Sequence, residues 1–210
     1  MDKASLQRIH LAIENSRDTI ISFPWDQMEN YKFWLSQSFQ IVSHTTRFLT
    51  KLGGSFGHDR NDFHLFSLRH LSEETNHELM AEKDLETLNS HVNRYPILSS
   101  TREMINSQYA LLSETPVAHF GFFLYLEILS VEYGPIVGPI LDAHFGAATR
   151  FVRHHVNEDP RHVDLIIDQL GKAKQDEISQ AIVNMESTQA LYCEMMKDIM
   201  VRVADLKIAS

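Results

Sequence analysis

Long stretches without glycine or proline dominate this chain, which has eight glycines and six prolines among its 210 residues. Within these stretches apolar residues recur at spacings of three and four, which is the period of an amphipathic helix. No alternating strand pattern, internal repeat or low-complexity tract interrupts this periodicity. The sequence therefore predicts an all-α fold, and its 43% of hydrophobic residues can form a substantial core in a single domain spanning residues 1–210.

Helix boundaries are predicted from glycine, proline and capping residues. The Ser-Ser-Thr run at 99–101 followed by Glu103 predicts a capping box, and the Gly-Pro pairs at 134–135 and 138–139 predict a turn. The Asp-Pro pair at 159–160 predicts the start of a further helix. The expected helices cover about residues 4–16, 26–52, 62–91, 101–113, 116–132, 138–156, 159–171 and 174–207.

Charge and cysteine content exclude several classes of protein. The net charge is −9 and no basic run or stripe is present, so we expect no nucleic-acid partner. Cys193 is the single cysteine, which rules out an internal disulfide and a thiolate metal site and favours a reducing compartment. Residues 1–18 do not form a signal peptide, and the apolar run at 120–131 is too short to span a bilayer. We expect a soluble cytoplasmic protein without a membrane partner.

The most informative polar pattern is His155, Asp159 and His162, at offsets of zero, four and seven. On one helix these positions form a single stripe, and nitrogen and oxygen donors that converge from one face suit a transition metal. His154 and Glu158 fall off this stripe. Asp159 has a second interpretation, as the N-cap of a helix that begins at Pro160, which would bend the stripe.

A second candidate pair is Glu74 and His77, three residues apart in a crowded polar stretch. Glu-x-x-His is the arrangement in which one helix presents a carboxylate and an imidazole to a di-iron bundle site. Glu73 would point about 100° away from Glu74, so only one of the two is expected to face the core. His70 shares the stripe and is a ligand, a partner behind the ligands or a surface residue. A solvated amphipathic face is the alternative for this segment.

Glu127 is a third candidate, because it stands alone inside the apolar run Phe122-Phe-Leu-Tyr-Leu-Glu-Ile-Leu-Ser130. A carboxylate is rarely buried unless a cation or good partners compensate for its lost hydration. A bound metal would meet that need. A neighbouring arginine or lysine, or a solvent-facing position, would meet it as well.

Three segments, at 70–85, 118–127 and 151–162, together resemble the heme-oxygenase-like di-iron oxidases and oxygenases, relatives of thiaminase-II and pyrroloquinoline-quinone-synthase-like proteins. They cover less than half of the chain, and the His-x3-Asp-x2-His element is the most specific. The resemblance implies a seven-helix heme-oxygenase-like bundle with two iron ions at its centre. The ligands that it implies are Glu74, His77, Glu127, His155, Asp159 and His162.

This donor set suits iron or manganese, because carboxylates and imidazoles are hard and borderline ligands. Two divalent ions bring four positive charges against three carboxylates, so the site is close to neutral. We therefore expect an oxidoreductase that uses O2 on a small organic substrate, lipid-like or amino-acid-like. Aromatic residues near the ligands are expected to form core or to line a substrate cavity: Phe120, Phe122, Phe123, Tyr125 and Phe151.

Other functions remain open at this point. A thiaminase-like hydrolase would need a cysteine nucleophile, and Cys193 is far along the chain from the matched segments. A quinone-cofactor synthase would need a basic pocket, and heme degradation would need an axial histidine such as His10. A metal-binding helical protein without turnover is the non-enzymatic alternative. The last helix carries methionines that fit either the core or a homodimer face: Met185, Met195, Met196 and Met200.

Overall fold

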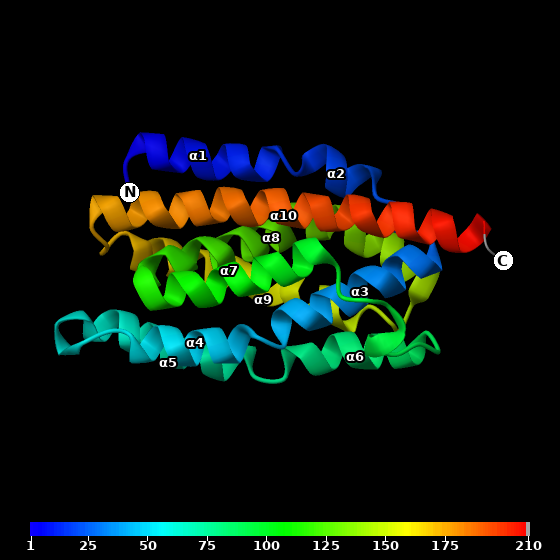
Figure 1. Ribbon diagram of the computed structural model, residues 1–210, viewed down its shortest axis with the longest axis horizontal. Helices are drawn as coiled ribbons and strands as arrows, with labels where there is room; N and C mark the ends of the chain where they lie inside the picture. The colour runs from blue at the N-terminus through cyan, green and yellow to red at the C-terminus, as the bar shows by residue number, and fades with distance from the viewer. Residues whose placement is uncertain (209–210) are drawn as a thin grey trace.

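A computed structural model describes residues 1–208, and side chains through Asp205, as an all-α bundle without a strand in that range (Figure 1). Three short 3-10 turns, His58–Arg60, Val92–Arg94 and Pro116–His119, join some of the helices. The α-helices are α1 Lys3–Glu14, α2 Arg17–Ser22, α3 Met28–Val42, α4 Thr45–Gly54, α5 Asn61–Glu74, α6 His77–Thr87, α7 Ser99–Glu114, α8 Phe120–Phe145, α9 Arg150–Leu170 and α10 Gln175–Ile208.

Three of the helical segments are interrupted. Two residues separate α1 from α2, α3 from α4, and α5 from α6. Counting each interrupted pair once, and adding α7, α8, α9 and α10, gives seven helical segments. The all-α, seven-helix prediction is therefore confirmed, although the breaks within 26–52 and 62–91 and the helical form of residues 17–22 were not predicted.

The core lies where α10 and α8 run side by side through the middle of the molecule (Figure 1). Helix α8 also packs along α9, α3 packs on α6, and α4 packs on α5. Met185, Met195 and Met196 are completely buried, and Met200 packs partly buried against the same core. These methionines therefore serve the core, and a homodimer remains a prediction.

Helix α8 continues through both Gly-Pro pairs, so the predicted turn at 134–139 is wrong. The rings of Pro135 and Pro139 lie on the exposed side of the helix, while Tyr133 and Val137 are buried. A Cβ at Gly134 would come within 2.3 Å of the Val156 side chain, so this glycine allows α8 and α9 to approach closely. Tertiary packing has overridden the local signal.

Two further boundary predictions are wrong. Helix α9 begins at Arg150 and passes through Pro160, so Asp159 lies inside a helix and does not cap one. The capping box at 99–101 does not form, because Leu98 is the N-cap of α7 and no side chain bonds there. The Thr101 hydroxyl instead donates to Gln37 Oε1 at 2.8 Å in the core.

One stretch, Pro116–Phe145, is long and apolar enough to cross a membrane. Because α8 is not interrupted, the expectation that its apolar run is too short to span a bilayer does not hold. Within this stretch, 61% of an apolar 18-residue window is nevertheless buried inside the bundle, as in the core helix of a soluble protein. The fold is therefore that of a soluble helical protein, and a cytoplasmic location remains a prediction.

Candidate metal centre

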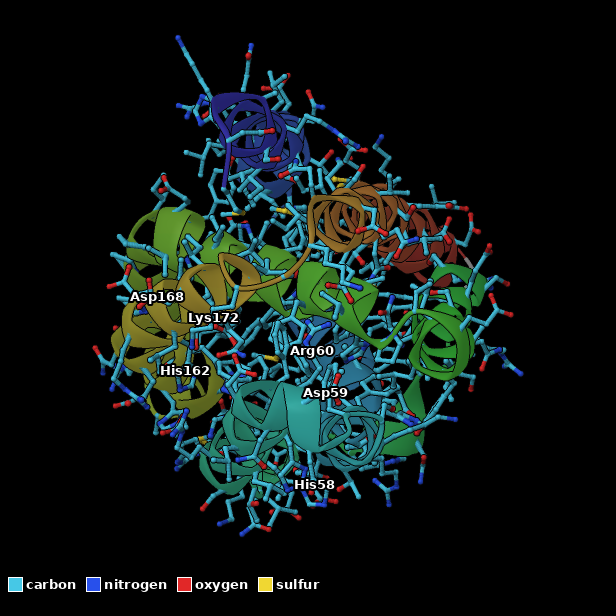
Figure 2. The ribbon with its side chains drawn as sticks, turned by 90° about the vertical axis from the view of Figure 1, so that its left-hand side faces the viewer. His58, Asp59, Arg60, His162, Asp168 and Lys172 are labelled. Atoms are coloured by element: carbon cyan, nitrogen blue, oxygen red, sulfur yellow. The ribbon has the colours of Figure 1, made fainter. Side chains whose placement is uncertain are left out.

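Four helices bring the candidate ligands together. Helix α9, which carries His162, lies beside α5 (Figure 2), and the His162 side chain is buried. Helix α8 supplies Glu127 from the middle of the core. Among the described residues, two overlapping groups of donors have ligand atoms within 4.8 Å of one another. The groups are His70, Glu74, Glu127 and His162, and Glu74, His77 and His155.

The first group is fully buried and tightly packed. His70 Nε2 lies 3.1 Å from Glu127 Oε1. His162 Nδ1 lies 3.7 Å from Glu74 Oε1 and 3.8 Å from Glu127 Oε1. Two imidazole nitrogens and two carboxylates therefore face one point from α5, α8 and α9.

The second group shares Glu74 with the first. His77 Nδ1 lies 3.1 Å from Glu74 Oε2, and the His77 and His155 rings are 5.1 Å apart between centroids. His155 Nδ1 bonds to the Phe151 carbonyl oxygen at 2.7 Å. Because that bond requires a proton on Nδ1, His155 Nε2 keeps a free lone pair for a metal. Glu74 is thus placed to bridge two ions.

Glu74 and His77 meet across a break between two helices, and not along one helix as the sequence suggested. Helix α5 ends at Glu74 and α6 begins at His77. Asn76 between them adopts a left-handed conformation with φ of 73°, which turns the chain. Asparagine tolerates this conformation better than most residues do. The two residues of the predicted pair do lie close together, but their geometry comes from this turn.

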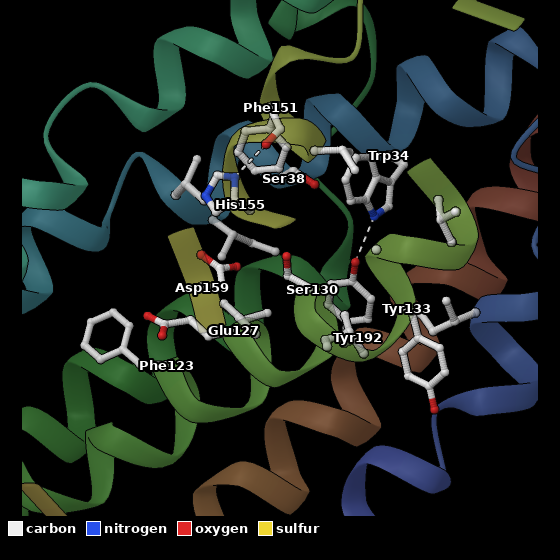
Figure 3. Close-up of a pocket in the computed structure, with 18 of the residues that line it drawn as sticks. Trp34, Ser38, Phe123, Glu127, Ser130, Tyr133, Phe151, His155, Asp159 and Tyr192 are labelled. Carbon is white, nitrogen blue, oxygen red and sulfur yellow. Dashed lines mark hydrogen bonds between the residues drawn. The ribbon is translucent and has the colours of Figure 1, made fainter. Parts of the chain in front are cut away.

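Asp159 belongs to neither tight group. Its Oδ1 lies 3.8 Å from His162 Nδ1, and the side chain is buried in the cavity wall beside Glu127 (Figure 3). The structure therefore brings five of the six expected ligands into the two groups and places the sixth next to them. It adds His70, whose position on the Glu74 stripe was the available sequence signal. That these residues bind metal remains a prediction.

Burial without a cation leaves two carboxyl groups in an unfavourable environment. Burial raises the pKa of Glu127 well above its ordinary value, and the negative charges of Glu74 and Glu73 raise it further. Burial, followed by the charge of Glu127, raises the pKa of Asp159 to about 9. A divalent cation among these groups would favour their ionised forms.

The imidazoles are already in the form that a metal needs. Burial lowers the pKa of His155 and of His162 to about 4, so both rings are neutral near pH 7. Burial opposes ionisation of Glu74 as well, but its contact with His77 outweighs that effect and lowers its pKa to about 2.

Several polar atoms of the centre have no hydrogen-bond partner. They are His70 Nε2, His77 Nδ1, His162 Nδ1 and Glu127 Oε2, all buried. Buried polar atoms are seldom left unpaired in folded proteins, and convergent unpaired donors of this kind fit a bound ion. The residues present therefore fit two divalent cations, with Glu74 between them.

A cavity of about 140 Å³ adjoins the centre (Figure 3). Glu74, Glu127, His155 and Asp159 form its polar end. Neither lysine nor arginine is found among its described lining residues. The remaining wall is mainly apolar and aromatic, and its largest side chains are Trp25, Trp34, Phe122, Phe123, Tyr133, Phe151 and Tyr192. Of the five aromatics expected to form core or cavity, Phe120 and Tyr125 belong to the core alone.

The arrangement of the helices resembles that of several solved proteins, one of which is described as having a heme-oxygenase-like fold. A domain of unknown function with this fold from Shewanella denitrificans OS217 matches with a TM-score of 0.87 at 16% identity, over 100% of this chain and 97% of that chain. A TenA homologue from Pseudomonas syringae pv. tomato DC3000 matches with a TM-score of 0.74 at 10% identity, over 94% and 93%. A CADD-like protein of unknown function from Nostoc punctiforme PCC 73102 matches with a TM-score of 0.71 at 12% identity, over 92% and 94%.

The protein therefore has a heme-oxygenase-like fold, as its sequence resemblance implied. No protein-family model matches the sequence, and no curated protein matches it. At these sequence identities the likeness shows the fold alone and does not show the reaction.

Proposed function

We propose that this protein is a non-heme dinuclear iron oxidase or oxygenase that uses O2 to oxidise a small organic substrate. The observation that carries the proposal is the pair of donor groups sharing Glu74, which opens onto a largely apolar cavity. Two ferrous ions, when bound, supply the electrons for reduction of O2. Manganese, which accepts the same donors, is the alternative metal.

The candidate ligands would hold the ions in different ways. Glu74 belongs to both groups and would contribute its carboxylate to each of the two ions. Glu127 and Asp159 contribute negative charge that offsets the charge of the cations in a buried site. The His155 ring is held by the Phe151 carbonyl, so its free nitrogen keeps a fixed direction.

The cavity supports a substrate with a substantial apolar part. Trp34, Phe123 and Phe151 exclude water from the region next to the carboxylates. Among the residues that the structure describes, its lining has no lysine or arginine that would hold the carboxylate of an amino acid away from the metals. Of the two expected substrate types, a lipid-like or other apolar molecule is therefore favoured.

The competing activities find less support in the site. Cys193 does not line the cavity and accepts a hydrogen bond from Gln189 within α10, so it is not placed as a nucleophile there. A polyacidic substrate would meet carboxylates and, among the described lining residues, neither lysine nor arginine. His10 is exposed on α1, away from the cavity.

Metal content and O2 uptake test the proposal. Protein loaded anaerobically with Fe²⁺ should hold two irons per chain by elemental analysis, and Glu127→Gln and His162→Ala should each hold less at unchanged helicity by circular dichroism. His58→Ala, which alters an exposed histidine outside the cavity, is the control. The ferrous wild type should consume O2.

Two results would count against the proposal. Failure of the wild type to bind iron or manganese would remove the metal centre altogether. Bound iron without O2 consumption, tested with a panel of apolar organic molecules, would favour the non-catalytic metal-binding alternative.

A further inference from the structure

Glu73 lies on the outer side of the metal centre, where its carboxylate faces two of the imidazoles. Its Oε2 lies 3.3 Å from His162 Nε2 and 3.9 Å from His70 Nδ1. The opposite nitrogen of each ring points inward, with His70 Nε2 3.1 Å and His162 Nδ1 3.8 Å from Glu127 Oε1. One carboxylate thus faces the outer nitrogens of both rings, while another faces their inner nitrogens.

Arg161 holds this outer carboxylate in place. Its guanidinium NH1 donates to Glu73 Oε1 at 3.1 Å, and its NH2 lies 3.2 Å from His162 Nε2. A metal at His162 Nδ1 needs the lone pair of that nitrogen, so the proton must reside on Nε2. Nε2 then becomes a donor, for which Glu73 is the acceptor, and Arg161 is left to bind Glu73. This is the carboxylate–histidine–metal arrangement that fixes ligand orientation in metal sites.

His70 has the properties of a ligand and not those of an ordinary core histidine. Its side chain is only 2% exposed, and its Nε2 has no hydrogen-bond partner. The ring lies between Phe66, stacked at 5.6 Å between centroids, and Phe123, edge-on at 5.4 Å. These aromatic contacts leave an imidazole nitrogen aimed at Glu127 with its lone pair unused. Such a buried, unpaired group needs a partner.

We infer that His70 is a seventh protein ligand of the centre, and that Glu73, held by Arg161, is the positioning residue that orients His70 and His162 toward the metal. The inference rests on the proposed metal centre and names a ligand beyond the six that the sequence resemblance implied. It gives the ion on the α5–α8 side four protein donors: His70, Glu74, Glu127 and His162.

Equilibrium titration with Mn²⁺ alone under anaerobic conditions tests this inference. The affinity of each ion is followed by the electron paramagnetic resonance signal of free Mn²⁺. His70→Ala and His70→Gln should each remove tight binding of one ion per chain. His64→Gln is the matched control, because His64 lies on the same helix and bonds instead to the Gly53 carbonyl.

The positioning role of Glu73 is tested in the same assay. Glu73→Ala should weaken binding by about 10- to 100-fold, the usual effect of losing a partner behind a metal ligand. Glu73→Gln keeps an acceptor oxygen and should recover part of that loss, whereas the exposed Glu86→Gln should have no effect. Co²⁺-substituted Glu73→Ala should also show an altered visible absorption spectrum, which a purely structural role would not produce.

The outcomes separate this inference from the proposed function. If the wild type binds two Mn²⁺ and the His70 variants do the same with equal affinity, the ligand role of His70 is wrong while the proposed centre stands. If Glu73→Ala binds as tightly as the wild type, the positioning role is wrong. If the wild type itself binds no metal, both this inference and the proposed function fail. Because Glu73 is largely at the surface, its variants remain informative even if the His70 variants do not fold.

Discussion

Glu127 and Asp159 are buried, and no lysine or arginine of the described chain forms an ion pair with either. The pKa of Asp159 is about 9, so its carboxyl group is protonated near neutral pH unless a cation is present, and burial shifts the pKa of Glu127 in the same direction. The metal-free and metal-bound proteins differ in charge at the centre, because metal binding must displace these protons.

The stability of the metal-free protein should fall as the pH rises from about 7 to about 9. A carboxyl group whose folded pKa is raised binds more protons in the folded state at every pH between its unfolded and folded pKa values. For Asp159 these are 3.8 and about 9, so its contribution lowers stability across that whole range and no further above it. The pKa values of His155 and His162 are lowered to about 4. These two residues therefore reduce the stability of the protein only on the acid side, below their unfolded pKa of about 6.5. Urea unfolding at several pH values, with a chelator present, measures how the free energy of unfolding changes with pH. Asp159→Asn should make this dependence weaker. Equal stability across this range would contradict the assignment.

Asn76 lies in the two-residue turn that joins Glu74 to His77, two members of the second donor group. It holds φ of 73° between Glu74, at the end of α5, and His77, at the start of α6. Asn76→Ala should cost about 1 kcal/mol, because a Cβ without asparagine's local hydrogen bonding disfavours this conformation. Asn76→Gly should stay within about 0.5 kcal/mol of the wild type. Urea unfolding checks stability and Mn²⁺ titration checks the ligands; equal stability of the two variants would argue against a strained turn.

At the scale of helices, two glycines of α8 differ in how closely another segment packs against them. Gly121 faces α10 so closely that an added Cβ would come within 1.8 Å of the Ala181 carbonyl oxygen. Gly138, on the same helix, has no atom within 4 Å of such a Cβ. The two glycines therefore have different roles within one element.

Gly121→Ala should destabilise the protein by about 3 kcal/mol, because the clash is with backbone and cannot be relieved by a side-chain rotation. Gly138→Ala should change stability by less than about 1 kcal/mol, because alanine is the better helix former and no other segment blocks its Cβ, but the ring of Pro139 disfavours the helical conformation of a preceding residue with a Cβ. Chemical unfolding of both variants is the measurement. A neutral effect at Gly121 would mean that α8 and α10 can separate without loss.

The helices also show which predictions a sequence can support. The stripe of His155, Asp159 and His162 was predictable, because the spacing of residues on one helix is a local property. The path of α8 through Pro135 and Pro139 was not, because only burial against α9 and α10 decides it. For the same reason the sequence placed His70 near the site but could not show that it faces Glu127 on another helix.

At the scale of the whole molecule, the centre links four helices, so metal binding should stabilise the entire fold. An ion that binds only the folded chain at about a hundred times its dissociation constant adds about 2.7 kcal/mol. Thermal unfolding should therefore shift upward with Mn²⁺ and return with a chelator. Glu74→Gln, which affects both donor groups, should lose most of this shift, and Glu86→Gln should keep it. An unchanged melting temperature in the wild type would contradict the metal centre.

Helix α10 has a consequence for how the protein is made. It runs the length of the bundle and packs against α1, α2, α3, α7 and α8 (Figure 1). During translation it emerges from the ribosome after all of these partners. Their apolar faces therefore stay exposed to solvent until α10 has been synthesised. During this interval the nascent chain most needs protection by chaperones.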